Sequence, residues 1–301
     1  MTKKFQVLIV DDSDDDREFC EEILQEDDQR EWAITSTESS QRALELVSEH
    51  QFDCVLLDYS MPRYNGIEVM QQLREHNTEV PVVMLTGQGT ERIAVEAMKA
   101  GAQDYVSKQD IALPHLSKTI LEAIERQQAK LDLLQRANYD HLTGLAGRAL
   151  FNDRLRGAFS RSDRNQKPFA LLFVDLDKSK AVNDTMGHKF GDLLLKEVAA
   201  RMIECTREGD TVARLGGDEF VLVLEDLPGD GRDIARQMVK RIAQAVADHP
   251  YSLEGHEVVV GTSIGVAIYP TTATDRKALM EAADLAMYEA KKTPGMHYKV
   301  A

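Results

Sequence analysis

The stretch Arg214-Leu215-Gly216-Gly217-Asp218-Glu219-Phe220 joins two short apolar runs, residues 211–215 and 220–224. Two such runs joined by a Gly-Gly-acid turn predict a β-hairpin. The glycines let the backbone of the tip approach a large ligand, because no Cβ obstructs it. The two adjacent carboxylates suit a hard divalent cation beside a phosphate chain. The alternative is a surface hairpin with solvated acids.

The chain has 301 residues, of which 43% are hydrophobic, and this length predicts two domains with sizeable cores. Its longest apolar runs, such as residues 169–174, are about six residues long, whereas a bilayer span needs ~20. The N-terminus shows no secretory pattern. Three widely spaced cysteines lack the spacing of a disulfide or metal site. We therefore expect a cytoplasmic protein with reduced thiols and no membrane partner.

The net charge of −15 is unevenly distributed. Residues 1–112 carry 24 Asp and Glu against 10 Lys and Arg, whereas residues 113–301 carry 27 against 26. The acidic first part argues against a nucleic acid polymer as its partner. The nearly neutral second part leaves cationic side chains free to face a triphosphate, although solvated acidic faces are common.

Four apolar runs in the first 112 residues alternate with helical patterns. The runs are residues 5–10, 54–57, 80–85 and 105–106. This alternation predicts a doubly wound parallel sheet with helices on both faces. Ligands bind such sheets at the carboxyl ends of the strands. The residues at those ends are Asp11, Asp12, Asp58, Thr86 and Lys108.

Three carboxylates at one sheet edge would repel one another unless a cation lay among them. We expect Asp12, Asp58 and the carbonyl of Ser60 to hold Mg²⁺, with Asp11 beside them. The strand-end lysine would neutralise a phosphoryl group, and the strand-end threonine would donate a hydrogen bond to it.

Four short motifs occur in this region. They are Leu57-Asp58-Tyr59-Ser60-Met61-Pro62, Asn65-Gly66, Leu85-Thr86-Gly87 and Asp104-Tyr105-Val106-Ser107-Lys108. Residues 1–112 thereby resemble the receiver domain of two-component response regulators. The resemblance implies a flavodoxin-like fold, a cognate histidine kinase as partner and Asp58 as the phosphoacceptor. It also implies that Tyr105 swings inward beside Thr86, with Lys108 completing the switch. An ordinary doubly wound domain with incidental strand-end acids is the alternative.

Residues 113–138 predict a connecting helix. Positions seven apart are Leu113, Ile120, Gln127 and Leu134, interleaved with Ser117, Ile124, Leu131 and Asn138. This spacing is typical of the seam of a short coiled coil and therefore indicates a homodimer. A helix that packs on its own receiver domain would show a similar pattern.

The remaining chain predicts an α+β domain with helices on one face of its sheet. The expected helices are residues 148–161, 191–206, 232–247 and 276–292, and the expected strands are 169–174, 258–260 and 262–268 besides the hairpin. The strand 169–174 leads into Asp175 and is expected beside the hairpin. Asp175 and Asp218 can then converge on one cation.

Further motifs occur between residues 139 and 296. They are Asp140, Leu142-Thr143-Gly144-Leu145, Asp175-Leu176-Asp177, Lys180, Asn183-Asp184, Gly187-His188, Gly191-Asp192, residues 214–220, residues 263–266, Ala283-Asp284, Tyr288 and Ala290-Lys291. In this order they resemble the GGDEF-domain diguanylate cyclases. The resemblance implies, for residues 139–301, a nucleotidyl-cyclase-like fold with a ferredoxin-like palm. It also implies synthesis of cyclic di-GMP from two molecules of GTP.

The same resemblance assigns the site residues. Asp175, the carbonyl of Leu176 and Asp218 would hold two Mg²⁺ or Mn²⁺ ions. Asn183 and Asp192 would read the guanine edge, since an Asp that accepts from guanine leaves the edge of adenine unmatched. The other implied residues are Lys180, Lys291, Gly216 and Gly217 for the phosphates, and Glu219 with Asp218 for catalysis.

Two departures from the family pattern bear on activity. Ser179 stands before Lys180, where the family usually has Phe, and the segment 291–296 lacks the Arg that usually follows the final Ala-Lys. A missing phosphate cation would weaken GTP binding, although Lys292 is a candidate substitute. We expect a phosphorylation-regulated diguanylate cyclase. A catalytically silent response regulator that binds GTP or cyclic di-GMP and acts through protein contacts is the alternative.

Arg207-Glu208-Gly209-Asp210 precedes the hairpin and resembles the RxxD inhibitory site that binds the cyclic di-GMP product. Arg241 is the candidate second cation of that site. An ordinary surface pair of Arg207 and Asp210 is the alternative reading.

Overall fold

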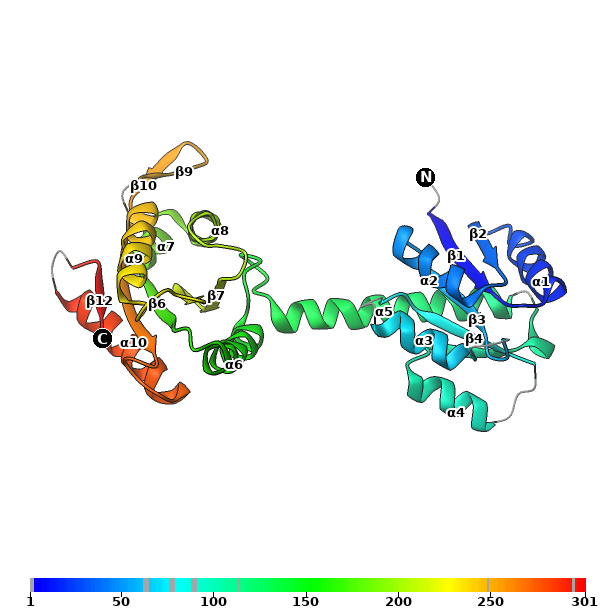
Figure 1. The fold of residues 1–301 in the computed structure, drawn as a ribbon. Helices are drawn as coiled ribbons and strands as arrows, with labels where there is room; N and C mark the ends of the chain where they lie inside the picture. Colours follow the sequence, from blue (N-terminus) through cyan, green and yellow to red (C-terminus); the bar gives the residue numbers. More distant parts are fainter. Residues whose placement is uncertain are drawn as a thin grey trace. The chain divides into compact units, whose positions relative to one another are not determined.

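The structure, a computed structural model, describes residues 3–61, 65–75, 79–87, 91–112, 114–247, 249–293 and 296–301. The chain divides into two compact units, Met1–Leu133 and Leu134–Ala301 (Figure 1). Each unit has its own sheet and its own hydrophobic core. Within the described ranges, every helix is too short or too polar to cross a lipid bilayer.

The N-terminal unit is built on a five-stranded parallel sheet of order β2-β1-β3-β4-β5. Its strands are β1 (Lys4–Val10), β2 (Glu31–Thr37), β3 (Cys54–Asp58), β4 (Val82–Thr86) and β5 (Asp104–Ser107). Its helices are α1 (Asp14–Gln25), α2 (Ser40–Glu49), α3 (Gly66–Glu75), α4 (Glu91–Ala100), the 3₁₀ turn η1 (Lys108–Asp110) and α5 (His115–Asn138), whose last residues belong to the C-terminal unit. One core cluster lies on each face of the sheet, which confirms the predicted doubly wound architecture.

The strand that the sequence analysis did not predict is β2, which lies at the edge of this sheet. Its residues are Glu-Trp-Ala-Ile-Thr-Ser-Thr, and none of them is fully buried. An edge strand needs no continuous apolar run, so β2 lacks the pattern that indicated the other four strands of the sheet.

The first half of α5 packs on its own unit. Leu116, Ile120 and Ala123 are buried in the same core cluster as Val106 of β5. The buried side chain of Gln127 accepts a hydrogen bond from Gln103 at 3.1 Å and donates one to Glu79 at 3.0 Å.

Four predicted seam positions pack within their own unit: Ser117, Ile120, Ile124 and Gln127. Another, Leu113, lies outside the described residues. The large apolar side chains that α5 leaves exposed are in its last turns, where Leu133 and Leu134 are 68% and 48% exposed.

The C-terminal unit has a five-stranded mixed sheet of order β12-β11-β6-β8-β7. Its strands are β6 (Phe169–Asp177), β7 (Thr211–Gly216), β8 (Glu219–Leu224), β11 (Gly261–Tyr269) and β12 (Tyr298–Val300), beside a separate hairpin of β9 (Tyr251–Leu253) and β10 (His256–Val258). Its helices are α6 (Arg148–Asn165), α7 (Ser179–Met186), α8 (His188–Glu204), α9 (Arg232–Ala247) and α10 (Arg276–Lys292). The predicted α+β class is confirmed.

Helices cover both faces of this sheet, so the expectation of helices on one face was wrong. Leu172 and Val174 of β6 pack in a cluster with residues of α8 and α9, whereas Phe169 and Leu171 pack in a second cluster with residues of α6 and α10 (Figure 1). The reason lies in β6 itself, whose apolar run is continuous. A strand with one solvated face would alternate apolar and polar residues.

Candidate functional site

The predicted hairpin is present, and two glycines shape its tip. β7 and β8 pair in antiparallel fashion, with a bulge between Arg214 and Gly216. Gly216 and Gly217 have φ angles of 144° and 55°, which side chains of L-residues rarely allow. A Cβ added at either glycine would meet no atom within 4 Å. The glycines therefore set the backbone shape and leave open space above the tip.

A buried arginine ties this tip to the loop that opens the unit. Arg214 donates to the carbonyl of Gly217 through Nε at 2.9 Å and Nη2 at 2.7 Å. Its Nη1 donates to both carboxylate oxygens of Asp140, at 2.9 and 3.0 Å. Burial alone would raise the pKa of Asp140, but hydrogen bonds from Thr143 and Arg214 lower it below its usual value. An ionised pair thus fixes the tip, a role that the sequence analysis did not assign.

Asp175 and Asp218 come together at one end of the sheet. The ladder between β6 and β8 ends at the pair Asp175 and Glu219, so Asp175 lies beside the residue that follows Asp218. Lys291, in the last turn of α10, places Nζ 2.6 Å from Asp175 Oδ1. The hydroxyl of Ser179 donates to Asp218 Oδ2 at 2.5 Å.

This pair of carboxylates is suited to a metal ion. Burial raises the pKa of Asp175, the hydrogen bond from Lys291 opposes that rise, and the charge of Asp218 adds to it. Leu176 lies one residue beyond the β6–β8 ladder. Two carboxylates and a backbone carbonyl are oxygen donors of the kind that Mg²⁺ and Mn²⁺ prefer, so the residues present fit such an ion.

Of the other residues implied for the nucleotide, Asn183 and Asp192 lie on consecutive helices, α7 and α8. A Cβ added at Gly191 would lie 1.9 Å from Asn183 Oδ1. The Asn183 side chain thus packs against the first turn of α8, next to Asp192, and only glycine permits this approach. Lys180 and Glu219 are exposed.

In the N-terminal unit, one lysine binds the strand-end acids. Lys108 Nζ lies 2.6 Å from Asp11, 2.7 Å from Asp16 and 2.9 Å from Asp58. Asp11, Asp12 and Asp58 each offer an oxygen within 4.8 Å of the others, and together they could hold a metal ion.

Burial and hydrogen bonding oppose each other in setting the pKa values of Asp11 and Lys108. It raises the pKa of Asp11 despite the hydrogen bond from Lys108. Burial alone would lower the pKa of Lys108, but its hydrogen bonds to Asp11, Asp16 and Asp58 raise it above its usual value. The ammonium group therefore stays charged at physiological pH.

The remaining residues predicted for this edge are Thr86, Ser60 and Tyr105. Thr86 is buried, and its hydroxyl has no hydrogen-bond partner among the described residues. Asp58 Oδ2 accepts from the backbone amide of Ser60 at 2.8 Å. Tyr105 is 42% exposed, in an outward position. A buried hydroxyl without a protein partner is a candidate hydrogen-bond donor to a ligand at this edge.

A family model for the diguanylate cyclase GGDEF domain matches residues 137–297, more than half of the chain. This chain belongs to that family. A model for the response regulator receiver domain matches residues 7–121. The chain is therefore a receiver domain fused to a GGDEF domain.

Several known proteins are similar to the GGDEF part. The bifunctional diguanylate cyclase/cyclic di-GMP phosphodiesterase MucR of Pseudomonas aeruginosa is 47% identical over 176 residues, which are 58% of this chain and 25% of MucR. The diguanylate cyclase TpbB of the same organism is 39% identical over 178 residues, which are 58% of this chain and 40% of TpbB. A solved structure of the TpbB GGDEF domain alone aligns with a TM-score of 0.52 and 38% identity, and covers 54% of this chain and 94% of that one.

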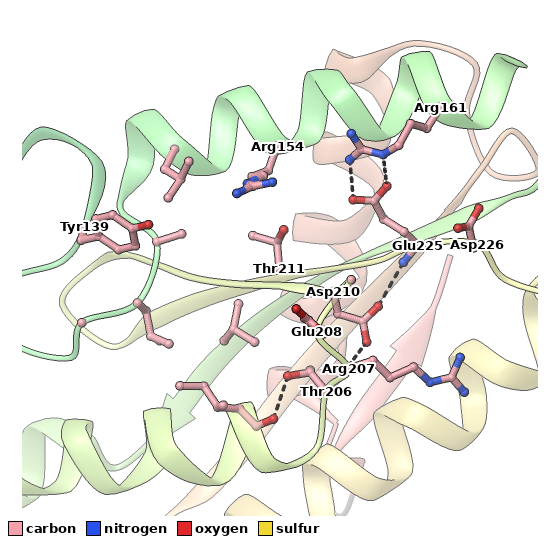
Figure 2. A pocket seen from close by; sticks show the side chains of 17 residues that line it. Tyr139, Arg154, Arg161, Thr206, Arg207, Glu208, Asp210, Thr211, Glu225 and Asp226 are labelled. Carbon is pink, nitrogen blue, oxygen red and sulfur yellow. Dashed lines mark hydrogen bonds and ion pairs between the residues drawn. The ribbon is translucent and has the colours of Figure 1, made fainter. Parts of the chain in front are cut away.

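An open hollow of about 850 Å³ lies at the β7 edge of the GGDEF unit (Figure 2), and Asp175 is not among its lining residues. Asp210 lies at its wall and accepts backbone hydrogen bonds from Arg207 at 3.0 Å and Glu225 at 3.2 Å. On the opposite wall, Arg161 of α6 donates twice to Glu225, at 2.6 Å each. Figure 2 shows the Arg207 side chain directed away from the hollow.

Arg241, the third residue predicted for the product site, has no hydrogen bond or ion pair with Arg207 or Asp210, all three of which the structure describes. Arg241 of α9 donates to the carbonyl of Cys205, two residues before Arg207. The Arg207 side chain is exposed, and the Asp210 carboxylate holds its own loop and the end of β8.

Proposed function

We propose that this chain is a phosphorylation-regulated diguanylate cyclase that makes cyclic di-GMP and pyrophosphate from two molecules of GTP. The observation that carries the proposal is the meeting of Asp175 and Asp218 at the glycine tip, with Lys291 bonded to Asp175. Bound Mg²⁺ or Mn²⁺ would polarise the α-phosphate and stabilise the pyrophosphate leaving group.

The chain's own residues bind and orient the nucleotide in this proposal. Lys180 and Lys291 contact the phosphates, and the open backbone at Gly216 and Gly217 admits them. Asn183 and Asp192 hydrogen-bond the guanine edge, since the packing of Asn183 against α8 brings these two positions together. Glu219 supports the cation site or accepts the proton of the 3′-hydroxyl, and its exposed position at the ladder end suits either role.

The reaction needs two nucleotides in symmetric positions. One GGDEF unit offers one such site, and each 3′-hydroxyl must attack the α-phosphate held by the other copy. The active species is therefore a C₂ homodimer. The exposed Leu133 and Leu134 at the end of α5 offer apolar surface for that association.

The receiver unit supplies the control. Asp58 is the phosphoacceptor for a cognate histidine kinase, because Lys108 would neutralise the added phosphoryl group and the unpartnered Thr86 hydroxyl would donate to it. The Mg²⁺ that this transfer needs would be held by Asp11, Asp12, Asp58 and the Ser60 carbonyl.

Product binding by Arg207, Asp210 and Arg241 is the second level of control in this proposal. Replacement of Arg207 by alanine should relieve product inhibition and leave the initial rate unchanged, since its side chain lies outside the GTP site. Progress curves that level off alike in parent and variant would contradict this role.

The test of activity is direct. The purified chain is incubated with GTP and Mg²⁺, and the nucleotides are then separated. Cyclic di-GMP and pyrophosphate in a 1:2 ratio support the proposal, and intact GTP contradicts it.

Two observations favour the second candidate, a silent receptor that binds GTP or cyclic di-GMP and acts through protein contacts. Ser179 stands where the family usually has an aromatic residue, and Lys292 Nζ lies 4.1 Å from the centre of the Tyr288 ring rather than at the acids. Nucleotide binding without turnover would identify this alternative.

A further inference from the structure

The chain turns sharply between β6 and α7, and this turn places a serine against the cation site. Lys178 has a φ angle of 64°, in the left-handed region, and occupies the N-cap position of α7 without a side-chain capping hydrogen bond. Ser179 follows as the first residue of that helix and is 8% exposed. Its hydroxyl donates to Asp218 Oδ2 at 2.5 Å, across 39 residues of sequence.

The hydrogen bond has a clear energetic role. A buried hydroxyl needs a partner, and a bond to a carboxylate is stronger than one between neutral groups. Within the described residues, Asp218 accepts no side-chain hydrogen bond besides the one from Ser179. The tip that carries Asp218 is held at Gly217 by Arg214, but that contact reaches only the backbone.

We propose that Ser179 is a positioning residue that fixes the Asp218 carboxylate for divalent cation binding together with Asp175. The inference rests on the function proposed above and deepens it. The phenyl ring that the family usually places before the lysine could not donate this hydrogen bond. In this chain, therefore, a hydroxyl orients the ligand, so the departure at Ser179 does not by itself indicate a damaged site.

The same sheet end offers a matched control. Ser263 is also buried, and its hydroxyl donates to Asp177 Oδ1 at 3.0 Å. Asp177 is not among the cation ligands proposed here. Ser179→Ala and Ser263→Ala each remove one serine hydroxyl from a carboxylate, at Asp218 and at Asp177 respectively, so the second variant is a control for the first.

The experiment measures how strongly Mn²⁺ tightens binding of α,β-methylene-GTP, an analogue whose α,β bridge cannot be cleaved. The dissociation constant of the full-length chain is determined with chelator and with saturating Mn²⁺, and the ratio of the two is the readout. Because the two bindings are linked, this ratio also reports how much the nucleotide tightens the metal. The receiver metal site does not enter the ratio, since the analogue binds only the GGDEF unit.

We expect Ser179→Ala to lower the ratio by about 10-fold, since loss of a partner of a metal ligand costs about 10–100-fold in metal affinity. Its metal-free dissociation constant should equal that of the parent. Ser179→Thr, which keeps a hydroxyl, and Ser263→Ala should stay within about 3-fold of the parent ratio.

Each other result is decisive. A parental ratio in Ser179→Ala together with its loss in Asp218→Ala overturns the positioning role but leaves the proposed cyclase site standing. If Ser179→Ala weakens analogue binding equally with and without Mn²⁺, Ser179 has a merely structural role, and the positioning role is overturned. If Mn²⁺ does not tighten the analogue on the parent chain, both the inference and the proposed cation site fall.

Discussion

The two units hold their carboxylates with lysines in opposite ways. In the receiver unit, Lys108 contacts three carboxylates at once, and its side chain is only 17% exposed. In the GGDEF unit, Lys291 contacts the single carboxylate of Asp175 and is 47% exposed. Both sites gather acids at a sheet end, but only the receiver encloses its counter-charge.

The difference follows from the two sheet topologies. Parallel strands bring all their carboxyl ends to one edge, so Asp11, Asp58 and the residue after β5 converge. In the GGDEF sheet, β6 and β8 run antiparallel, and the second acid comes from a hairpin tip instead. Lys291 reaches this site from the last turn of α10, so its half-exposed ammonium group remains accessible to solvent, whereas that of Lys108 is enclosed.

The largest expected effect tests the GGDEF side of this comparison. Asp218→Ala should lower turnover by about 10⁴-fold at saturating Mn²⁺, because it removes a cation ligand. The fold should remain, since the residue belongs to no core cluster. Asp153→Ala, at an exposed acid of α6, serves as the control and should keep the parent rate. Substantial product from the Asp218 variant would show that the cation is held elsewhere.

The next effect tests the receiver side. Lys108→Ala leaves buried Asp11 and Asp58 without their counter-charge, so the receiver unit should lose about 3–5 kcal/mol of stability. The only tryptophan, Trp32, lies in β2, so urea unfolding followed by its fluorescence reports this unit. The matched variant Lys291→Ala should leave that transition in place. Equal stability of the Lys108 variant and the parent would remove the contrast between the enclosed and the exposed lysine.

A smaller effect concerns the response to phosphorylation. A phosphoryl group at Asp58 would offer the Thr86 hydroxyl an acceptor, and the space that Thr86 vacates could take Tyr105. We expect beryllofluoride with Mg²⁺ to raise dimer fraction and cyclase rate together. A shift of ~1–3 kcal/mol corresponds to severalfold up to about a hundredfold.

Sedimentation and turnover, measured over one concentration range, check this expectation, and Asp58→Ala should lose both responses. A rate that rises without a change in association would mean that an existing dimer reorients. No change in either quantity would contradict the coupling.

Much of the fold and of the two candidate sites could be predicted from the sequence where the deciding residues are close together in the chain. Each inner receiver strand ends in the polar residue that the apolar run indicated, and the Gly-Gly tip is in its hairpin. What the sequence did not predict depends on distant contacts. Asp16 joins Lys108 from a helix 92 residues away. Ser179 bonds to Asp218 across 39 residues and directly follows Lys178, whose backbone is in the left-handed region.

The helices on both faces of the GGDEF sheet could have been predicted. The continuous apolar runs of β6 and β8 already exclude a solvated face. The α5 pattern, in contrast, was ambiguous for a physical reason. Apolar residues at spacings of three and four allow a helix to pack on a partner helix or on the sheet of its own domain equally well. Three-dimensional contacts, such as that of Gln127 with Gln103, are needed to decide between the two.

The smallest expected effect tests whether the largely buried ion pair of Asp140 and Arg214 stabilises the GGDEF unit. Asp140→Asn keeps one acceptor oxygen but loses the charge, so it should cost about 1 kcal/mol at pH 7. The pKa of Asp140 is lowered in the folded state, so its contribution is present above the unfolded pKa of about 3.9 and is lost as pH falls through the folded value. Parent and variant should therefore become equally stable in acid. Unfolding followed by circular dichroism, with Trp32 fluorescence as the receiver control, measures the difference. A gap that persists below the folded pKa would mean that shape rather than charge holds the tip.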